Sequence, residues 1–233
     1  MAGKILYEGK AKTIYEGDND RELIMKFRNT ATAFNGEKRE ELDGKGVLNC
    51  TISGIIFREL EKIGIPTHMI EQIDDVTVRV KKVQIVPLEV IVRNVAAGSF
   101  SKRFGVPEGS ELKSTVLEFC YKDDALGDPM INDSQIYALG LATKEEIAAI
   151  ADYTTKINAF MQKFFLEAGL KLIDFKIEFG RCDGKIVLAD EISPDSCRLW
   201  DVKTNEKLDK DRFRRNLGNV MEAYKEVLRR ISQ

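Results

Sequence analysis

The sequence is poor in the residues that build metal and disulfide frameworks. It holds one histidine, His68, which excludes sites made of several histidines and allows a Ser-His-Asp hydrolase only if this residue is the base. His68 lies in a strand-like stretch without a partner motif, so we expect a structural role. The four cysteines are widely spaced with no C-x-x-C pair, which predicts reduced thiols rather than a zinc site or a disulfide framework.

Long apolar runs and a surplus of one charge are also absent. No run approaches the ~20 residues needed to span a membrane, and the opening MAGKILYEGKAK lacks the apolar core of a secretory signal. We therefore expect a cytoplasmic protein with no membrane partner. The 36 basic and 38 acidic side chains nearly cancel to a net charge of −2, which argues against nucleic-acid binding, because that needs Lys and Arg in excess.

Neither of the common glycine motifs for phosphate binding is present. Nothing matches G-x-x-x-x-G-K-[ST], and no G-x-G-x-x-G follows a strand, so a P-loop or a Rossmann site is not expected. The stretch YEGKAKTIY instead places Lys10 and Lys12 on one strand face beside Gly9. Two ammonium groups next to a glycine that lets backbone approach a ligand would suit polyphosphate oxygens. The alternative is a solvated strand face.

The patterns that are present indicate an α+β fold. With 233 residues and 43% hydrophobic content, the chain suits one compact body or two closely packed lobes. Alternating segments predict an N-terminal antiparallel β lobe over 1–85, interrupted by one helix over 43–63. The C-terminal lobe, 86–233, is expected to combine strands with helices. Antiparallel strands with segregated helices favour α+β over a doubly wound fold.

The expected elements follow from local periodicity and turn signals. The expected strands are two short ones around Gly9 within 4–17, followed by 21–29, 67–73, 76–85, 87–96, 114–122, 170–180 and 184–193. The expected C-terminal helices lie over 99–105, 144–168 and 212–231, and the acidic segment 123–134 is expected to be a turn-rich loop.

The stretch LIDFKIEFG, residues 172–180, alternates charged and apolar side chains. Asp174, Lys176 and Glu178 share one face of the expected strand, and apolar side chains share the other. The turn sequence GRCDG then predicts a β-hairpin with the next strand. A three-residue loop would place Glu178 opposite Asp190, and such a carboxylate pair with substrate phosphates is a usual way to hold Mg²⁺. A two-residue turn would put Asp190 on the other face, and a solvated edge face neutralised by Lys176 is the other interpretation.

The segment DEISPDSCRLWD, which begins at Asp190, is dense in charge. It gathers four carboxylates around Pro194, Arg198 and the only tryptophan, Trp200. A charged loop at a strand end indicates a site, because function concentrates on loops held by rigid elements. The alternative is a surface turn in which Arg198 pairs with an aspartate and Trp200 anchors the core.

The segment IVPLEVIVRNVAAGSFSKRFG contains a charge in an apolar run. Arg93 lies among valines and isoleucines, where an isolated charge is costly unless it is paired or turned into a cleft. Gly98 and Ser99 open a short expected helix, with Ser99 as its N-cap. A helix N-terminus beside an arginine favours a phosphate group. An ordinary cap with a buried salt bridge fits equally well.

Five ordered segments resemble those of the SAICAR synthetase family of purine biosynthesis, phosphoribosylaminoimidazole-succinocarboxamide synthases. They are LYEGKAKTIY, IVPLEVIVRNVAAGS, KDDALGDPMIN, LIDFKIEFG and DEISPDSCRLWD, and the resemblance covers essentially the whole chain. It implies a two-lobed α+β fold related to ATP-grasp enzymes and protein kinases. It also implies an ATP-dependent ligation of L-aspartate to the carboxylate of 5-amino-1-(5-phosphoribosyl)imidazole-4-carboxylate (CAIR), giving SAICAR, ADP and phosphate through an acyl phosphate.

The resemblance also implies roles for residues that match the family motifs. For ATP these are Lys10 and Lys12 on the phosphates and Lys81, Val83 and Ile85 around the adenine. For Mg²⁺ they are Glu178 and Asp190. For CAIR they are Arg93, Ser99 and Arg198, with Asp195 as a further candidate. The resemblance places the catalytic groups Asp174, Lys176 and Glu178 in the same cleft.

Some features depart from the family pattern or leave alternatives open. Asn35 stands where some family members have aspartate, so a carboxylate contact there is not carried over. The loop 122–133 is a candidate lining of the L-aspartate pocket, with a plain acidic surface loop as the alternative. The family implies a homodimer. A kinase that uses the same ATP cleft is the competing function, although the chain has no H-R-D-L-x-x-x-N or D-F-G segment.

Overall fold

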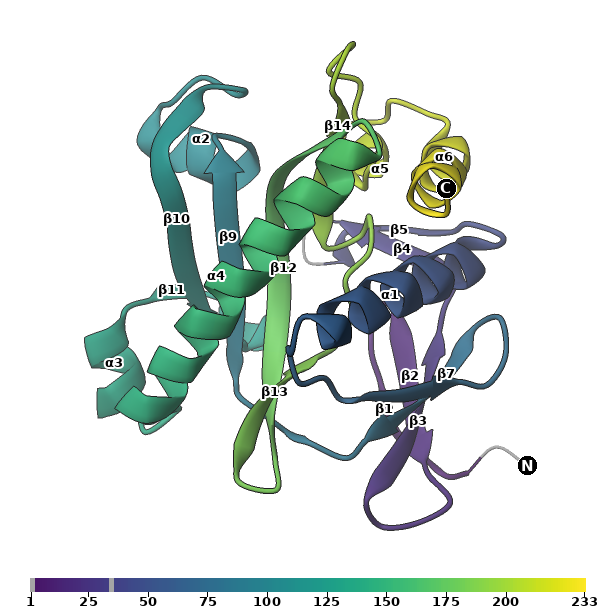
Figure 1. The fold of residues 1–233 in the computed structure, drawn as a ribbon, viewed down its shortest axis with the longest axis vertical. Helices are drawn as coiled ribbons and strands as arrows, with labels where there is room; N and C mark the ends of the chain where they lie inside the picture. The colour runs from purple at the N-terminus through teal and green to yellow at the C-terminus, as the bar shows by residue number, and fades with distance from the viewer. Residues whose placement is uncertain (1–2, 34–35) are drawn as a thin grey trace.

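The computed structural model describes residues 3–33 and 36–233, and Asn35 lies outside the described residues. Their strands form a five-stranded sheet in the order β1-β2-β3-β7-β6, a seven-stranded sheet built around β12 and a two-stranded sheet, β4-β5 (Figure 1). Every pairing between these strands is antiparallel. The α+β fold with antiparallel sheets is therefore confirmed.

The bounds of the strands are β1 (Ile5–Glu8), β2 (Lys12–Glu16), β3 (Glu22–Phe27), β4 (Thr30–Ala33), β5 (Lys38–Glu41), β6 (Met69–Gln72), β7 (Thr77–Lys81), β8 (Gln84–Ile85), β9 (Leu88–Val95), β10 (Glu111–Tyr121), β11 (Met130–Ile131), β12 (Leu170–Cys182), β13 (Lys185–Ala189) and β14 (Cys197–Asp201). The helices are α1 (Lys45–Lys62), α2 (Gly98–Phe104), the short 3₁₀ helix η2 (Asp124–Leu126), α3 (Asp133–Ala138), α4 (Lys144–Glu167), α5 (Asp211–Arg214) and α6 (Val220–Ile231).

Strand β12 organises the larger sheet. It pairs with β9, β13, β14 and the short β8, so segments far apart in sequence meet along its length. Strand β7 belongs to the five-stranded sheet and β8 to the seven-stranded sheet. Residues 82–83 are therefore the connection between these two sheets. Any group bound beside this connection would lie where the two sheets meet.

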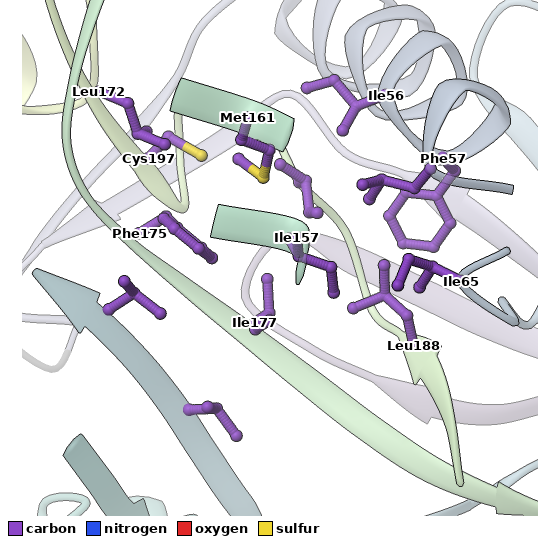
Figure 2. Close-up of a cluster of buried hydrophobic side chains, with 14 of the residues drawn as sticks. Ile56, Phe57, Ile65, Ile157, Met161, Leu172, Phe175, Ile177, Leu188 and Cys197 are labelled. Atoms are coloured by element: carbon purple, nitrogen blue, oxygen red, sulfur yellow. The ribbon is translucent and has the colours of Figure 1, made fainter. Parts of the chain in front are cut away.

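One apolar core joins the helices to the larger sheet. Helix α4 lies across the face of β9 and β12, and α1 lies near the five-stranded sheet (Figure 1). Figure 2 shows Ile56 of α1, Ile157 of α4 and Ile177 of β12 converging in this core, and all three are fully buried. Along each of these elements the apolar residues recur with the period of a helix or a strand, which places them on one face, as the sequence predicts.

The single histidine and the single tryptophan both lie in the interior of the fold. His68 is buried against Phe57, with ring centroids 5.6 Å apart, and burial lowers its pKa to about 3, so the imidazole is neutral. All four cysteines are free, and Trp200 packs with Val95 and Ile173. Within 3–33 and 36–233, no helix is long and apolar enough to cross a bilayer.

Three expected elements differ from the structure. The single strand over 76–85 is wrong, because β7 ends at Lys81 in the five-stranded sheet and β8 begins at Gln84 in the seven-stranded sheet. The single helix over 212–231 is wrong, because α5 ends at Arg214 and α6 begins at Val220. Asn216, Gly218 and Asn219 between them take left-handed φ values of 55°, 71° and 51°, which an α-helix does not accommodate. The segment 123–134 is also more ordered than a loop, since it holds η2, β11 and the start of α3.

Candidate active site

The hairpin between β12 and β13 closes with a two-residue turn. Cys182 pairs with Lys185, and Glu178 pairs with Ala189. The expected three-residue loop, with Glu178 directly opposite Asp190, is therefore wrong. The physical reason is that Asp183 and Gly184 both adopt positive φ, 49° and 73°, as the tight turn favoured by Asp-Gly requires.

The two carboxylates nevertheless approach one another. Strand β13 ends at Ala189, and Asp190 takes a left-handed φ of 60°, so its side chain leaves the alternation of the strand. The Lys176 Nζ lies 2.6 Å from Glu178 Oε1 and 3.3 Å from Asp190 Oδ2. The left-handed backbone at Asp190, rather than the register of the hairpin, brings Glu178 and Asp190 to the same ammonium group of Lys176.

Lysines from distant segments surround this carboxylate pair. Lys12 of β2 forms ion pairs with Asp190 and with Glu191, the latter at 3.1 Å. Lys122, just after β10, lies 2.9 Å from Glu178. Of the two lysines that the sequence places together, only Lys12 is directed at these carboxylates. Lys10 lies before β2 and pairs with Asp124 at 2.7 Å, so the expected shared strand face is wrong.

The pKa shifts of Lys12, Lys176 and Asp190 keep these three groups charged. Burial lowers the pKa of Lys12, but attraction to Asp190 and Glu191 outweighs burial and raises it to about 12. For Lys176 the carboxylates likewise overcome desolvation and raise the pKa well above its usual value. Burial would raise the pKa of Asp190, yet Lys12 and Lys176 hold it well below its usual range. At neutral pH these groups are therefore ionised.

The donor set suits a cation that arrives with phosphate ligands. In the part of the chain that the structure describes, no group of three or more His, Cys, Asp or Glu side chains is arranged to hold a metal. The Lys176 ammonium, however, contacts one oxygen of Glu178 and one of Asp190, so a cation fits between them. Mg²⁺ is usually held by one or two carboxylates together with substrate phosphates and water.

The residues expected around the adenine lie along the connection between the sheets. Lys81 ends β7, and its ammonium donates to the Thr67 carbonyl at 3.0 Å. Ile85 of β8 pairs with Gly180 of β12. Val83 packs directly over Gly180, where a methyl group would come within 2.5 Å of the Val83 side chain. The absence of a side chain at Gly180 thus fixes the position of this connection.

We expect Gly180→Ala to destabilise the protein by about 1–3 kcal/mol, because the added methyl displaces Val83 and strains a packed strand. Urea unfolding followed by circular dichroism measures the loss. A Gly180→Ala/Val83→Ala double variant frees the space and should recover part of the stability. An unchanged urea midpoint in Gly180→Ala would show that the connection at 82–83 can shift without loss of stability.

A second group of predicted residues lines one pocket. Its volume is about 230 Å³, and its charged and polar lining includes Arg93, Ser99, Asp174, Lys176, Asp195, Arg198 and Arg214. Strands β9, β12 and β14, helices α2 and α5 and the segment after β13 supply these residues. Lys176 belongs both to this pocket and to the carboxylate cluster, so the two regions adjoin along one face of β12.

Two arginines in the pocket are held by buried carboxylates. The Arg93 guanidinium donates to Glu118 at 2.8 Å, to Asp174 at 3.1 Å and to the Ser99 hydroxyl at 3.0 Å. Arg198 donates to both Asp174 oxygens, at 3.0 and 2.8 Å, and its Nε donates to Asp211 at 3.0 Å. Such a fixed fork of N–H donors is suited to carboxylate and phosphate oxygens.

Ser99 is not the N-cap of α2. The N-cap is Ala97, which makes no side-chain capping bond, and Ser99 is the second residue of the helix. Its hydroxyl accepts a hydrogen bond from Arg93 instead. The cap expected from local sequence is wrong because Arg93 on β9 competes for the hydroxyl, while Ser99 still lies in the pocket.

We expect Gly98→Ala to weaken anion binding in this pocket about tenfold, since small misplacements of binding groups have effects of this order. A methyl group at Gly98 would lie 2.4 Å from Nη2 of Arg198, which Asp174 and Asp211 hold in place. Gly109→Ala is the matched control, because its φ is also positive but Trp200 lies 3.6 Å away. Calorimetric titration of each variant with inorganic phosphate tests this, and equal effects of the two variants would contradict it.

Asp195 lines the pocket, but its carboxylate is engaged in an interior cluster. The Lys45 ammonium lies 2.5 Å from one oxygen, and the Tyr224 hydroxyl donates to the other at 2.6 Å. Burial would raise the pKa of Asp195, whereas Lys210 and Lys45 hold it well below its usual value. The structure places Asp195 as a link between α1, α6 and the loop after β13, and its role toward substrate stays a prediction.

Three residues at the site have no individual role in the sequence predictions: Lys122, Glu191 and Arg214. Lys122 enters them only as the first residue of the candidate loop 122–133, and Glu191 only as one of the four carboxylates that begin at Asp190. Lys122 contacts Glu178, Glu191 contacts Lys12, and Arg214 lines the pocket beside Arg198. Local signals existed in the KDD and DEIS segments and in the run RFRR. None of them indicates which side chains meet, because the contacts depend on how β10, β13 and α5 are placed around β12.

Comparisons with known proteins agree with this arrangement. Residues 5–231 match the family model described as SAICAR synthetase. A phosphoribosylaminoimidazole-succinocarboxamide synthase from Lachnoclostridium phytofermentans is 61% identical over 97% of this chain and 96% of its own length. Another from Clostridium novyi is 57% identical over 100% and 99%.

Solved structures give the same result. The Ehrlichia chaffeensis phosphoribosylaminoimidazole-succinocarboxamide synthase superposes with a TM-score of 0.96 at 45% identity over 98% of both chains. A SAICAR synthetase in complex with ADP superposes with a TM-score of 0.94 at 48% identity, over 97% of this chain and 96% of that one. With its antiparallel sheets, its arginine pocket and these full-length likenesses, the chain belongs to the SAICAR synthetase family.

Proposed function

We propose that this chain joins L-aspartate to the carboxylate of CAIR at the expense of ATP, giving SAICAR, ADP and phosphate. The observation that carries the proposal is the face of β12. There Asp174 orients two arginines toward an anion pocket, and Lys176 connects that pocket to the lysine and carboxylate cluster around Glu178. An anionic substrate and a polyphosphate would thus meet beside one ammonium group.

The chemistry requires a poor acyl donor to be activated. A carboxylate oxygen of CAIR attacks the γ-phosphorus of ATP, the bond from that phosphorus to the bridging oxygen breaks, and ADP leaves. The aspartate amine then attacks the acyl carbon, loses a proton and expels phosphate. Both steps depend chiefly on positioning and on neutralising negative charge.

Each residue group would serve one part of this sequence. Arg93, Ser99 and Arg198 bind the phosphate and carboxylate of CAIR. Lys10 and Lys12 bind ATP phosphates, and the catalytic residue Lys176 lies between the two substrates. Glu178 and Asp190 would hold Mg²⁺, which offsets phosphate charge when bound.

The N-terminal part of the chain contacts the nucleotide, and the C-terminal part contacts the other substrates and the metal. Residues 1–85 form the lobe that covers ATP, with the adenine beside Lys81, Val83 and Ile85. Residues 86–233 supply the CAIR pocket and the metal carboxylates, and the loop 122–133 lines the L-aspartate pocket. The protein works as a cytoplasmic homodimer, and sedimentation of the purified chain tests the dimer.

Product analysis separates this function from its competitors. The purified chain is incubated with CAIR, ATP and Mg²⁺, with and without L-aspartate, and SAICAR, ADP and phosphate are measured. A ligase makes SAICAR and phosphate in equal amounts and releases phosphate only as aspartate is consumed. A stable phosphorylated product without aspartate would indicate a kinase, and nucleotide binding without turnover would indicate a regulator.

A further inference from the structure

Lys122 occupies an unusual position at the candidate active site. It directly follows β10, and its backbone N–H donates to the Pro87 carbonyl at 3.0 Å, which fixes the start of its side chain. Its ammonium lies 2.9 Å from Glu178 Oε1, and the Lys176 ammonium lies 2.6 Å from the same oxygen. Two cations thus share one buried carboxylate oxygen.

The two lysines differ in how firmly they are held. Lys176 has two more carboxylates nearby, Asp190 at 3.3 Å and Glu89 at 3.7 Å. Lys122 pairs with Glu178 alone among the described residues, and its side chain is 42% exposed, against 4% for Glu178. A divalent cation that binds the Glu178 oxygen must displace an ammonium group, because like charges repel at this range. Moving the Lys122 ammonium away from Glu178 therefore costs less free energy than moving that of Lys176.

The surroundings indicate where the Lys122 ammonium would go. Asp124, two residues further along, pairs with Lys10 of the β1–β2 hairpin at 2.7 Å. Lys122 therefore lies between the carboxylate cluster and the hairpin that carries Lys10 and Lys12. A flexible ammonium group leaving Glu178 in this position faces the space between Glu178 and the hairpin lysines, where polyphosphate oxygens are expected.

We propose that Lys122 is a phosphate-binding residue of the nucleotide site that exchanges its partner, leaving the Glu178 carboxylate when a divalent cation takes that oxygen. The inference rests on the proposed function, because it assumes that the hairpin lysines bind ATP phosphates. Without a metal, the Lys122 ammonium neutralises the Glu178 carboxylate. Once the metal is bound, the same ammonium adds a positive charge beside the nucleotide phosphates.

Binding measurements on Lys122→Met test the exchange without relying on turnover. Titration with Mn²⁺ alone, followed by electron paramagnetic resonance, should show a dissociation constant lower by a few fold, because a competing cation is gone. Calorimetric titration with ADP in excess Mg²⁺ should show a dissociation constant higher on the order of tenfold, as expected for one lost charge-assisted hydrogen bond. The two changes have opposite signs, which a merely structural residue would not produce.

Two further variants sharpen the test. Lys122→Arg keeps the charge and should restore both constants to near the wild-type values. Lys156→Met removes a lysine that, within 3–33 and 36–233, pairs only with Asp152 on the exposed face of α4, and it should change neither constant. Repeating the titrations at about 0.3 M KCl screens long-range attraction between exposed charges, so an effect that persists reflects direct contact.

The outcomes separate this inference from the proposed function. Opposite shifts in Lys122→Met that Lys122→Arg reverses support the exchange, even if the wild-type chain makes no SAICAR. Wild-type SAICAR synthesis together with unchanged binding in Lys122→Met overturns the exchange and leaves the proposed function standing. Weaker binding of both Mn²⁺ and ADP, or a loss of folded protein in urea unfolding, also overturns it in favour of a structural role.

Discussion

Asp190→Asn should lower turnover on the order of 10²–10³-fold while the protein stays folded, since charge stabilisation by a metal site contributes several kcal/mol. The Asp190 carboxylate forms ion pairs with Lys12 and Lys176, and the proposal gives it a Mg²⁺ ligand role with Glu178. The amide has nearly the same shape but no charge, so it cannot replace a carboxylate ligand. Steady-state rates across a range of Mg²⁺ concentrations measure the effect.

Glu178→Gln should behave in the same way, because Glu178 accepts from both Lys176 and Lys122. Asp152→Asn is the matched control, since Asp152 makes an exposed pair with Lys156 on α4. Circular dichroism and urea unfolding establish that each variant is folded. Wild-type rates in either site variant at ordinary Mg²⁺ would contradict the metal assignment.

Arg93→Ala should chiefly raise the requirement for CAIR and should also destabilise the protein by about 3 kcal/mol, the low end expected for breaking a buried ion pair. Arg93 is 3% exposed and pairs with Glu118 and Asp174. The loss stays at the low end because Arg103 still pairs with Glu118 and Arg198 still pairs with Asp174.

Separate KM values for CAIR and ATP, together with urea unfolding, measure the two effects of Arg93→Ala. Arg93→Lys is the control, because an ammonium keeps the charge but not the three directed N–H contacts, and it should recover stability more than CAIR binding. An effect on ATP alone would mean that Arg93 belongs to a different pocket from the one proposed.

Strand periodicity was sufficient to place one face of the site. The alternation in LIDFKIEFG predicts that Asp174, Lys176 and Glu178 share a face, and their contacts with Arg93, Asp190 and each other bear this out. The apolar face is equally regular, with Phe175, Ile177 and Phe179 in the core. A period of two is a local property of a strand, so sequence alone reveals it.

The contacts that complete the site were beyond sequence reasoning. Asp190 joins Glu178 only because Asp183-Gly184 makes a tight turn and Asp190 itself takes a left-handed conformation. Ser99 serves Arg93 rather than the helix N-terminus because β9 and α2 are adjacent in space. Such contacts depend on turn geometry and on pairing between distant strands, which local propensity does not encode.

The break between α5 and α6 has a similar origin. Apolar periodicity extends through residues 212–231, but Asn216, Gly218 and Asn219 tolerate left-handed backbone and interrupt the helix. The interruption places Arg212 so that its guanidinium donates to the Gly218 carbonyl at 2.7 Å. Asn and Gly together were the available signal for this turn.

The proposed chemistry is tested most directly by following oxygen from CAIR to phosphate. CAIR labelled with oxygen-18 in its carboxylate is turned over with ATP, Mg²⁺ and L-aspartate, and the released phosphate is analysed by mass spectrometry. Attack of the carboxylate on the γ-phosphorus predicts that each phosphate carries one labelled oxygen and that the new amide retains the other. Unlabelled phosphate alongside labelled SAICAR would contradict an acyl phosphate and with it the proposed role of this site.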